Sequence, residues 1–185
     1  MKKKNKVKIA SARAGNVIGG GDWSNNRIIP DYIKSIQNNK SLNIRNPKST
    51  RPWQHVLEPL HGYLKLASEL RNKKAINGQS FNFGPKKYDN KTVIDVIKEV
   101  KKNIDKGSWK ITRTNKQKNK EAKLLYLNSN KAKKYLNWKS LLSFSEGIKF
   151  TSDWYKSYLT IKGKKRIITF DQIDKYMKIA RNRRH

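Results

Sequence analysis

The chain has 185 residues, and its 44 Lys and Arg against 13 Asp and Glu give a formal net charge of +31. Five Trp, eight Tyr and five Phe argue against a disordered chain, and the length suits one domain or part of one. The absence of Cys excludes disulfides and thiolate metal sites, and no apolar run is long enough for a membrane span or a signal peptide. We therefore expect a soluble, cytoplasmic, folded protein with no membrane partner.

The positive charge is spread along the whole chain and comes mostly from Lys. Such a field attracts any polyanion. A dedicated nucleic-acid-binding protein more often concentrates Arg and Lys on one element, with aromatic residues beside them. We therefore interpret most of the lysines as a solvated surface, and expect nucleic acid to bind only non-specifically through charge.

The first half of the chain alternates between strand and helix spacing. A strand is predicted at residues 7–12, entering a Gly-rich turn, because apolar and small or polar residues alternate there. Apolar residues at helical spacing predict helices with a proline in the first turn of each. The predicted elements after the Gly-rich turn are a helix at 28–36, strands at 42–44 and 53–55, a helix at 56–70 and a strand at 79–83.

The second half begins two helices with capping patterns. Thr92 with Asp95, and Ser143 with Glu146, each place a side-chain acceptor three residues before a carboxylate. Residues 113–123 are almost entirely polar, which predicts a mobile loop. The other predicted elements are strands at 109–112 and 124–127, a short helix at 130–136, a basic linker at 162–166 and an amphipathic helix at 173–179.

The glycine cluster resembles a dinucleotide-binding turn only in part. Gly19 and Gly21 match the first two positions of G-x-G-x-x-G, but Ser24 stands at the third. No apolar helix starts there, and no acidic residue follows about twenty positions later to hold a ribose. We expect instead a tight loop that lets the backbone approach a ligand.

Two further sets of residues could have a functional role, but a structural role explains each of them as well. His55, Glu58 and His61 have the spacing of metal ligands, yet a Glu in a first helical turn and a His at a strand end usually have structural roles. We expect no metal site. Trp53 and Trp138 are expected in the core rather than stacked on a base. From these residues alone, the chain is an α/β domain.

Several segments, in a fixed order, resemble the second half of the CDP-glucose 4,6-dehydratases, which belong to the extended short-chain dehydrogenase/reductase superfamily. They are ARAGNVIGGGDW at 12–23, RIIPD at 27–31, IRNP at 44–47, RPWQHVLEPL at 51–60 and NFGP at 82–85. The resemblance implies an α/β fold, namely the C-terminal part of an extended Rossmann-type sugar-nucleotide dehydratase. Remnant core strands would be joined to the smaller α/β substrate-binding region.

The resemblance also divides the chain. Residues 1–185 would form a single incomplete unit. Within it, 7–23 would supply a core strand and the Gly-rich loop, and 24–160 the substrate-binding region with returning core elements. Residues 161–185 would form a basic linker and a C-terminal helix.

The family reaction oxidises glucose C4 with NAD, removes water across C5 and C6, and returns the hydride to C6. By resemblance, Arg51 would grip the diphosphate of a CDP-sugar, which a guanidinium can do with two parallel hydrogen bonds. Asn16 matches a position near the bound substrate, and Arg27 and Trp23 lie where the family closes over the nucleotide. The resemblance assigns no catalytic, cofactor-binding or metal-binding residue to this chain.

In the family, a glycine-rich NAD turn and a catalytic Tyr-x-x-x-Lys precede the segment that resembles residues 12–23. Here neither precedes it. We therefore expect a substrate-binding half that is inactive and does not bind NAD alone, with a separately encoded N-terminal half as a candidate partner. The alternatives are a stand-alone CDP-sugar binding module and a basic nucleic-acid-associated protein.

Overall fold

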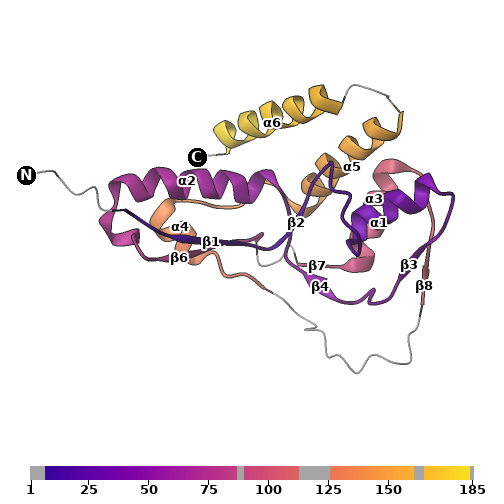
Figure 1. Ribbon diagram of the computed structural model, residues 1–185, viewed down its shortest axis with the longest axis horizontal. Helices are drawn as coiled ribbons and strands as arrows, with labels where there is room; N and C mark the ends of the chain where they lie inside the picture. Colours follow the sequence, from indigo (N-terminus) through magenta and orange to yellow (C-terminus); the bar gives the residue numbers. More distant parts are fainter. Residues whose placement is uncertain (1–6, 87–89, 113–125, 161–164, 184–185) are drawn as a thin grey trace, which may run out of the picture.

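The structure is a computed structural model that describes residues 7–86, 90–112, 126–160 and 165–183 (Figure 1). Within these ranges its strands pair two by two, and the pairs join segments that are distant in the sequence. The parallel pairs are β1 (Ser11–Ala14) with β6 (Ser80–Phe83), β2 (Asn16–Ile18) with β5 (Trp53–His55), and β3 (Leu42–Ile44) with β8 (Trp109–Ile111). The antiparallel pair is β4 (Thr50–Arg51) with β7 (Lys91–Thr92).

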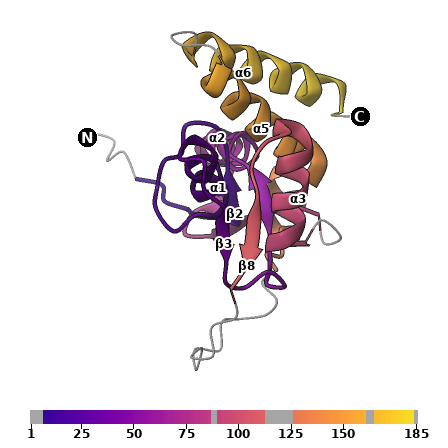
Figure 2. The same ribbon diagram turned by 90° about the vertical axis from the view of Figure 1, so that its right-hand side faces the viewer.

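Helices cover these short sheets. They are α1 (Ile28–Gln37), α2 (Leu57–Asn72), the 3₁₀ helix η1 (Lys74–Ile76), α3 (Val93–Ile104), α4 (Asn130–Leu136), α5 (Phe144–Thr160) and α6 (Lys165–Asn182). In the described residues, no helix is long and apolar enough to cross a membrane. Figure 2 shows β3 and β8 side by side with α1 and α3 beside them, and α6 at the far edge of the molecule.

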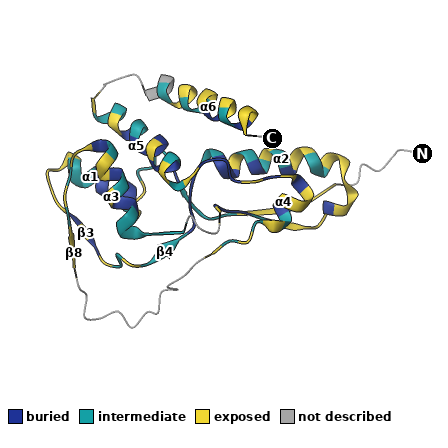
Figure 3. Cartoon of the chain, turned by 180° about the vertical axis from the view of Figure 1, so that it is seen from behind, coloured by how far each residue is buried: buried dark blue, intermediate teal, exposed yellow. Residues whose placement is uncertain are grey.

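The apolar side chains gather in three clusters. The largest lies between α1, α3, β3, β5 and α5, and it includes the fully buried Tyr32, Ile33 and Val96. A second cluster joins α2, β6 and α4 around Phe83 and Trp138, whose rings meet edge to face at 5.0 Å. A third joins the segment before α5 to α6. The outer faces of α2 and α6 remain exposed (Figure 3).

The capping predictions are confirmed. Thr92 and Asp95 form a reciprocal capping box at the start of α3, whose apolar residues Val96, Ile97 and Val100 are fully buried. Ser143 Oγ accepts a hydrogen bond from the Glu146 N–H at 3.3 Å, while Glu146 Oε2 accepts one from the Ser143 N–H at 2.8 Å. Local side-chain acceptors therefore determine where both helices begin.

Most of the predicted elements are also confirmed, with boundaries shifted by one or two residues. The helix at 130–136 and the strands at 42–44 and 53–55 have the predicted bounds. The helices at 28–36 and 56–70 and the strands at 79–83 and 109–112 correspond to α1, α2, β6 and β8. Trp53 and Trp138 lie in the core as expected, with 7% and 1% of their surfaces exposed.

The strand prediction at 7–12 is wrong in its position. β1 begins at Ser11, and Val7 and Ile9 are 80% and 66% exposed. The chain then changes partner: β1 pairs with β6, whereas β2, which was not predicted, pairs with β5. Gly15 lies at this change, and a Cβ there would approach the Pro52 carbonyl oxygen to 2.4 Å. A glycine is therefore required where the backbones come this close.

Two other predictions need correction or fall outside the described residues. Lys165 and Arg166, predicted to belong to a basic linker, lie in the first turn of α6, which is much longer than the predicted 173–179. Tyr126 and Leu127 are not in a strand, against the prediction for 124–127. The remainder of that segment, the predicted mobile loop at 113–123 and the linker residues 162–164 lie outside the described residues.

The Arg183–Glu146 ion pair attaches the end of α6 to the start of α5, and it predicts a pH dependence of stability. Arg183 donates to both carboxylate oxygens, at 2.7 and 3.1 Å. This contact, with the hydrogen bonds from Ser143, lowers the pKa of Glu146 from 4.5 to about 2. Because the folded-state pKa is depressed, the stabilisation is full above about pH 5 and is lost as the pH falls towards 2.

We therefore expect Glu146→Gln to lower the Tm at pH 7, with a difference from wild type that shrinks as the pH is lowered from 5 to 3. Thermal unfolding at several pH values measures this. Asp153→Asn is the matched control, because Asp153 pairs with Lys149 at 3.0 Å on an exposed face and such pairs contribute about 0–1 kcal/mol. A Glu146→Gln difference that stays constant with pH would contradict the assignment.

Candidate functional site

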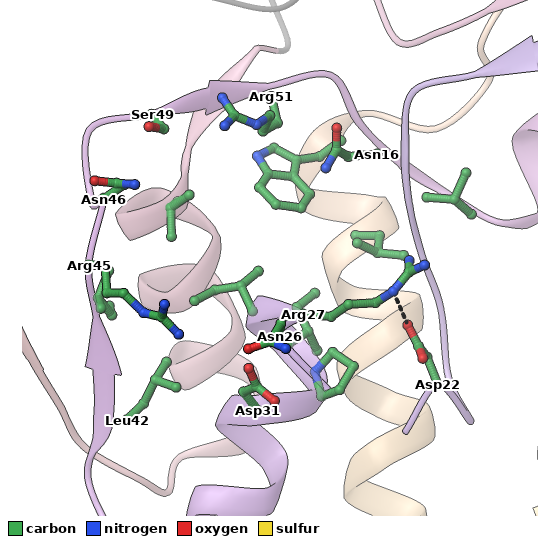
Figure 4. A pocket seen from close by; sticks show the side chains of 18 of the residues that line it. Asn16, Asp22, Asn26, Arg27, Asp31, Leu42, Arg45, Asn46, Ser49 and Arg51 are labelled. Carbon is green, nitrogen blue, oxygen red and sulfur yellow. Dashed lines mark ion pairs between the residues drawn. The ribbon is translucent and has the colours of Figure 1, made fainter. Parts of the chain in front are cut away.

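A hollow of about 930 Å³ opens between α1, β2, β3 and the segment that leads into β5. Its walls come from three stretches of sequence that the fold brings together: residues 15–31, residues 42–53 and Val93. Figure 4 shows polar side chains from all around the rim directed towards it. The polar and charged side chains among the lining residues are Asn16, Asp22, Asn26, Arg27, Asp31, Asn43, Arg45, Asn46, Ser49 and Arg51.

Backbone pairing places Asn16 and Arg51 at the same side of the hollow. Asn16 begins β2 and lies opposite Trp53 in the parallel pair, and its N–H donates to the Pro52 carbonyl at 2.9 Å. Arg51, two residues before Trp53, lies opposite Lys91 in the β4–β7 pair. Its Nη1 donates to the Thr50 carbonyl at 2.8 Å. The register of these two strand pairs therefore determines where Asn16 and Arg51 lie at the hollow.

Arg27 enters the hollow from the residue just before α1. Its Nε lies 3.8 Å from Asp22 Oδ2, and its side chain is 59% exposed. Exposed ion pairs of this kind contribute about 0–1 kcal/mol. The guanidinium can therefore leave Asp22 for an anionic ligand at little cost.

Trp23 lies elsewhere. Its ring contacts those of Tyr155 and Tyr158 on α5, with centroids 5.5 and 4.8 Å away, and it is not among the residues that line the hollow. The structure thus brings together three of the four predicted substrate-binding residues, Asn16, Arg27 and Arg51, and places the fourth against α5.

The glycine loop packs against α5 at Gly20, whereas Gly19 lies among the lining residues of the hollow. A Cβ on Gly20 would lie 1.9 Å from Trp154 Cγ, and one on Gly19 would lie 3.0 Å from a Val56 methyl carbon. Tyr155 OH donates to the Asp22 carbonyl. The absent side chain of Gly20 makes room for Trp154, and close approach of this loop to a ligand stays a prediction.

Asp31 and Arg45 are charged residues of the hollow that were given no role from the sequence. Asp31 lies in the first turn of α1, and Arg45 directly follows β3. Burial raises the pKa of Asp31, and the nearby charges of Lys34 and Arg45 partly oppose this. Both residues lie inside segments that carry the family resemblance, which was the available signal. Their proximity depends on α1 packing beside β3.

His55, Glu58 and His61 do not converge. Both carboxylate oxygens of the buried Glu58 accept hydrogen bonds from the Leu141 N–H, at 3.1 and 3.0 Å, and burial raises its pKa. Burial also lowers the pKa of His55 to about 4, so its ring is neutral at pH 7. Over the described ranges, no three potential ligands are grouped to hold a metal.

The spacing Tyr-x-x-x-Lys does occur at Tyr135 and Lys139, but α4 ends at Leu136, so the two residues do not share a helix face. The Tyr135 ring lies 6.5 Å from that of Phe81. The same spacing recurs at Tyr158, where the lysine, residue 162, lies outside the described residues. Tyr135, Lys139 and Tyr158 are not among the residues that line the hollow.

A family model described as GDP-mannose 4,6 dehydratase matches residues 5–151. The chain belongs to this family. A CDP-glucose 4,6-dehydratase from Salmonella typhimurium is 43% identical over 154 residues, which cover 83% of this chain and 42% of that protein. The chain therefore spans less than half the length of this relative, and the expected resemblance is confirmed for the part that it spans.

Solved structures of other proteins have a similar fold. A UDP-glucuronic acid 4-epimerase from Bacillus cereus, in complex with UDP-glucuronic acid and NAD, has a TM-score of 0.67 at 22% identity, over 83% of this chain and 46% of its own. A dTDP-glucose 4,6-dehydratase from Bacillus anthracis, in complex with NAD, has a TM-score of 0.64 at 19% identity, over 80% and 44%. The expected Rossmann-type α/β fold is confirmed.

Because Trp154 occupies the space beside Gly20, we expect Gly20→Ala to destabilise the fold by about 1–3 kcal/mol, as overpacking does. Urea unfolding measures the change. The matched control is Gly147→Ala in α5, where an added Cβ meets nothing closer than 3.6 Å and alanine favours the helix. Equal effects of the two substitutions would show that Trp154 adapts freely.

Proposed function

We propose that this chain binds the nucleotide diphosphate of a CDP-sugar in the hollow, as the substrate-binding part of a CDP-glucose 4,6-dehydratase. The reaction would convert CDP-glucose to CDP-4-keto-6-deoxyglucose. The observation that carries the proposal is the convergence of Asn16, Arg27 and Arg51 on one hollow, in a chain 43% identical to a protein with that name.

The charges around the hollow support an anionic ligand. Three arginines, Arg27, Arg45 and Arg51, outnumber two aspartates, Asp22 and Asp31, among its lining residues. Asp22 already has Arg27 as a partner. A diphosphate accepts parallel hydrogen bonds from guanidinium groups, whose planar geometry matches it better than an ammonium does.

The described residues do not fit NAD. Pyrophosphate groups of dinucleotides bind where a glycine-rich turn leads directly into a helix. Here the glycine loop is followed by residues 22–27 before α1 begins at Ile28, and Trp154 packs on Gly20. We propose that NAD and the groups that move protons are supplied by a separate N-terminal half.

This division of labour can be tested by incubating CDP-glucose and NAD with the chain alone, and then with the N-terminal part of the Salmonella typhimurium relative added. We expect the 4-keto product only in the second mixture. Product formed by the chain alone would refute the division. Nucleotide-sugar binding without turnover in either mixture would favour a stand-alone binding module.

We expect Arg51→Ala to raise the Kd for CDP-glucose by roughly ten- to a hundredfold, because a charge-assisted contact worth about 1.5–3 kcal/mol is lost. Arg51→Lys should recover only part of this, since an ammonium cannot form the two parallel bonds. Calorimetric titration at fixed salt measures both variants.

The control is Arg71→Ala, which removes an equal charge from the exposed end of α2. If Arg51→Ala and Arg71→Ala weaken binding equally, the interaction is a general response to the +31 charge, which also predicts steep salt dependence with any polyanion. That result would favour the nucleic-acid-associated alternative.

A further inference from the structure

We propose that Asp31 and Arg45 together bind the hydrogen-bonding edge of cytosine, and that this pair selects CDP-sugars over UDP- and dTDP-sugars. The inference rests on the proposed function, because it places the base of the same nucleotide whose diphosphate Arg51 would hold. The question arises from the relatives themselves: one is named for CDP-glucose, whereas solved structures with the same fold are named for UDP- or dTDP-sugars.

Asp31 and Arg45 both line the hollow, and they come from different walls of it. Figure 4 shows both side chains directed into it, with Arg51 at the opposite edge from Asp31. Asp31 belongs to α1 and Arg45 to the segment after β3, so two separate elements hold the carboxylate and the guanidinium. Apolar residues near them in the sequence also line the hollow, and mostly apolar walls are usual for sites that hold a flat ring; they are Ile28, Pro30, Leu42 and Ile44.

The pair has the hydrogen-bonding pattern that complements cytosine. Along its edge, cytosine presents the N4 amine as a donor and then N3 and O2 as acceptors, whereas uracil and thymine present O4 as an acceptor, N3–H as a donor and O2 as an acceptor. An ionised carboxylate only accepts, and a guanidinium only donates. Asp31 can therefore accept from the N4 amine while Arg45 donates to N3 and O2. Uracil would set O4 against the carboxylate and N3–H against the guanidinium.

The surroundings of Asp31 leave it able to accept a further hydrogen bond. The Asn26 N–H donates to its carboxylate, and Lys34 and Arg45 favour its ionised form against the effect of burial. A carboxylate has about four acceptor positions, so the Asn26 contact orients the group without exhausting it. Asn26 itself has a left-handed backbone conformation, with φ of 60°.

Asp31 also has an ordinary explanation, since an acidic residue in the first turn of a helix interacts favourably with the helix dipole. That role would affect the stability of the chain, but it would not change the preference for one nucleotide over another. Base preference therefore separates the two explanations.

The experiment compares CDP with UDP in calorimetric titrations of the full chain, because the two ligands carry the same diphosphate and differ only in the base. We expect wild type to bind CDP at least about tenfold more tightly than UDP, because a well-matched contact to a base edge discriminates by about 1–3 kcal/mol. Asp31→Asn should raise the Kd for CDP by roughly tenfold and leave the Kd for UDP within about threefold of wild type. The reason is that the asparagine amide can turn a donor towards O4 of uracil.

Arg45→Gln is the second variant, and it should also reduce the ratio of UDP to CDP dissociation constants. Arg45 is exposed, so this substitution tests the pairing even if Asp31→Asn lowers the Tm. A Tm change without a change in the nucleotide ratio of either variant would assign Asp31 to the helix dipole and overturn the inference.

The outcomes also separate this inference from the proposed function. If wild type binds CDP in an Arg51-dependent manner but shows no preference over UDP, or if both variants keep the wild-type ratio within about twofold, base selection lies elsewhere and the proposed function stands. If wild type binds neither nucleotide, the proposed function fails and base selection fails with it. Loss of preference in both variants, with Arg51-dependent CDP binding in wild type, supports both.

Discussion

The parallel pairing of β2 with β5 is the contact on which the hollow depends. It joins residues 16–18 to residues 53–55, and so brings the loop that carries Asp22 and Arg27 beside the segment that carries Arg45 and Arg51. The approach is close at its start, where the Asn16 N–H donates to the Pro52 carbonyl and Gly15 leaves no room for a Cβ. Parallel strands need a long crossover, and here that crossover, through α1 and β3, forms the other wall of the hollow.

Helix α5 holds the loop that follows β2. Trp154 covers Gly20, Tyr155 donates to the Asp22 carbonyl, and Trp23 packs against the same helix. Trp154 Nε1 in turn donates to Thr169 Oγ1 on α6 at 3.0 Å. Asp22 is thus fixed through its backbone while its side chain meets Arg27, so the aromatic residues of α5 constrain the ligand-facing loop without entering the hollow.

Glu58 plays a comparable part away from the hollow. As a buried carboxylate it would be costly alone, but it accepts from the backbone N–H groups of Leu141 and Leu142. These bonds fasten the start of α2 to the segment before α5. Tyr176 on α6 also donates to it, and the nearby carboxylate raises the pKa of that tyrosine beyond the effect of burial. A residue considered as a metal ligand thus ties three elements together.

The sequence was sufficient to predict those features that depend on residues close together in the chain. The Thr92–Asp95 capping box, the helical spacing of α1 and α2, and the alternation in β6 all act within a few positions, so each could be predicted. The family resemblance added Asn16, Arg27 and Arg51, which line one hollow. The strand β2 was missed because three residues after a glycine carry no pattern of their own, and only pairing with β5 makes them a strand.

By itself, therefore, the sequence determined most of the helices, the caps of α3 and α5, the family resemblance, and Asn16, Arg27 and Arg51 as candidates that the hollow brings together. Only the tertiary structure decided that Trp23 contacts α5, that Gly20 makes room for Trp154, and that Asp31 and Arg45 face one hollow. The physical reason is that these contacts join residues distant along the chain. Packing and strand register create them, and neither is visible in the spacing of neighbouring residues.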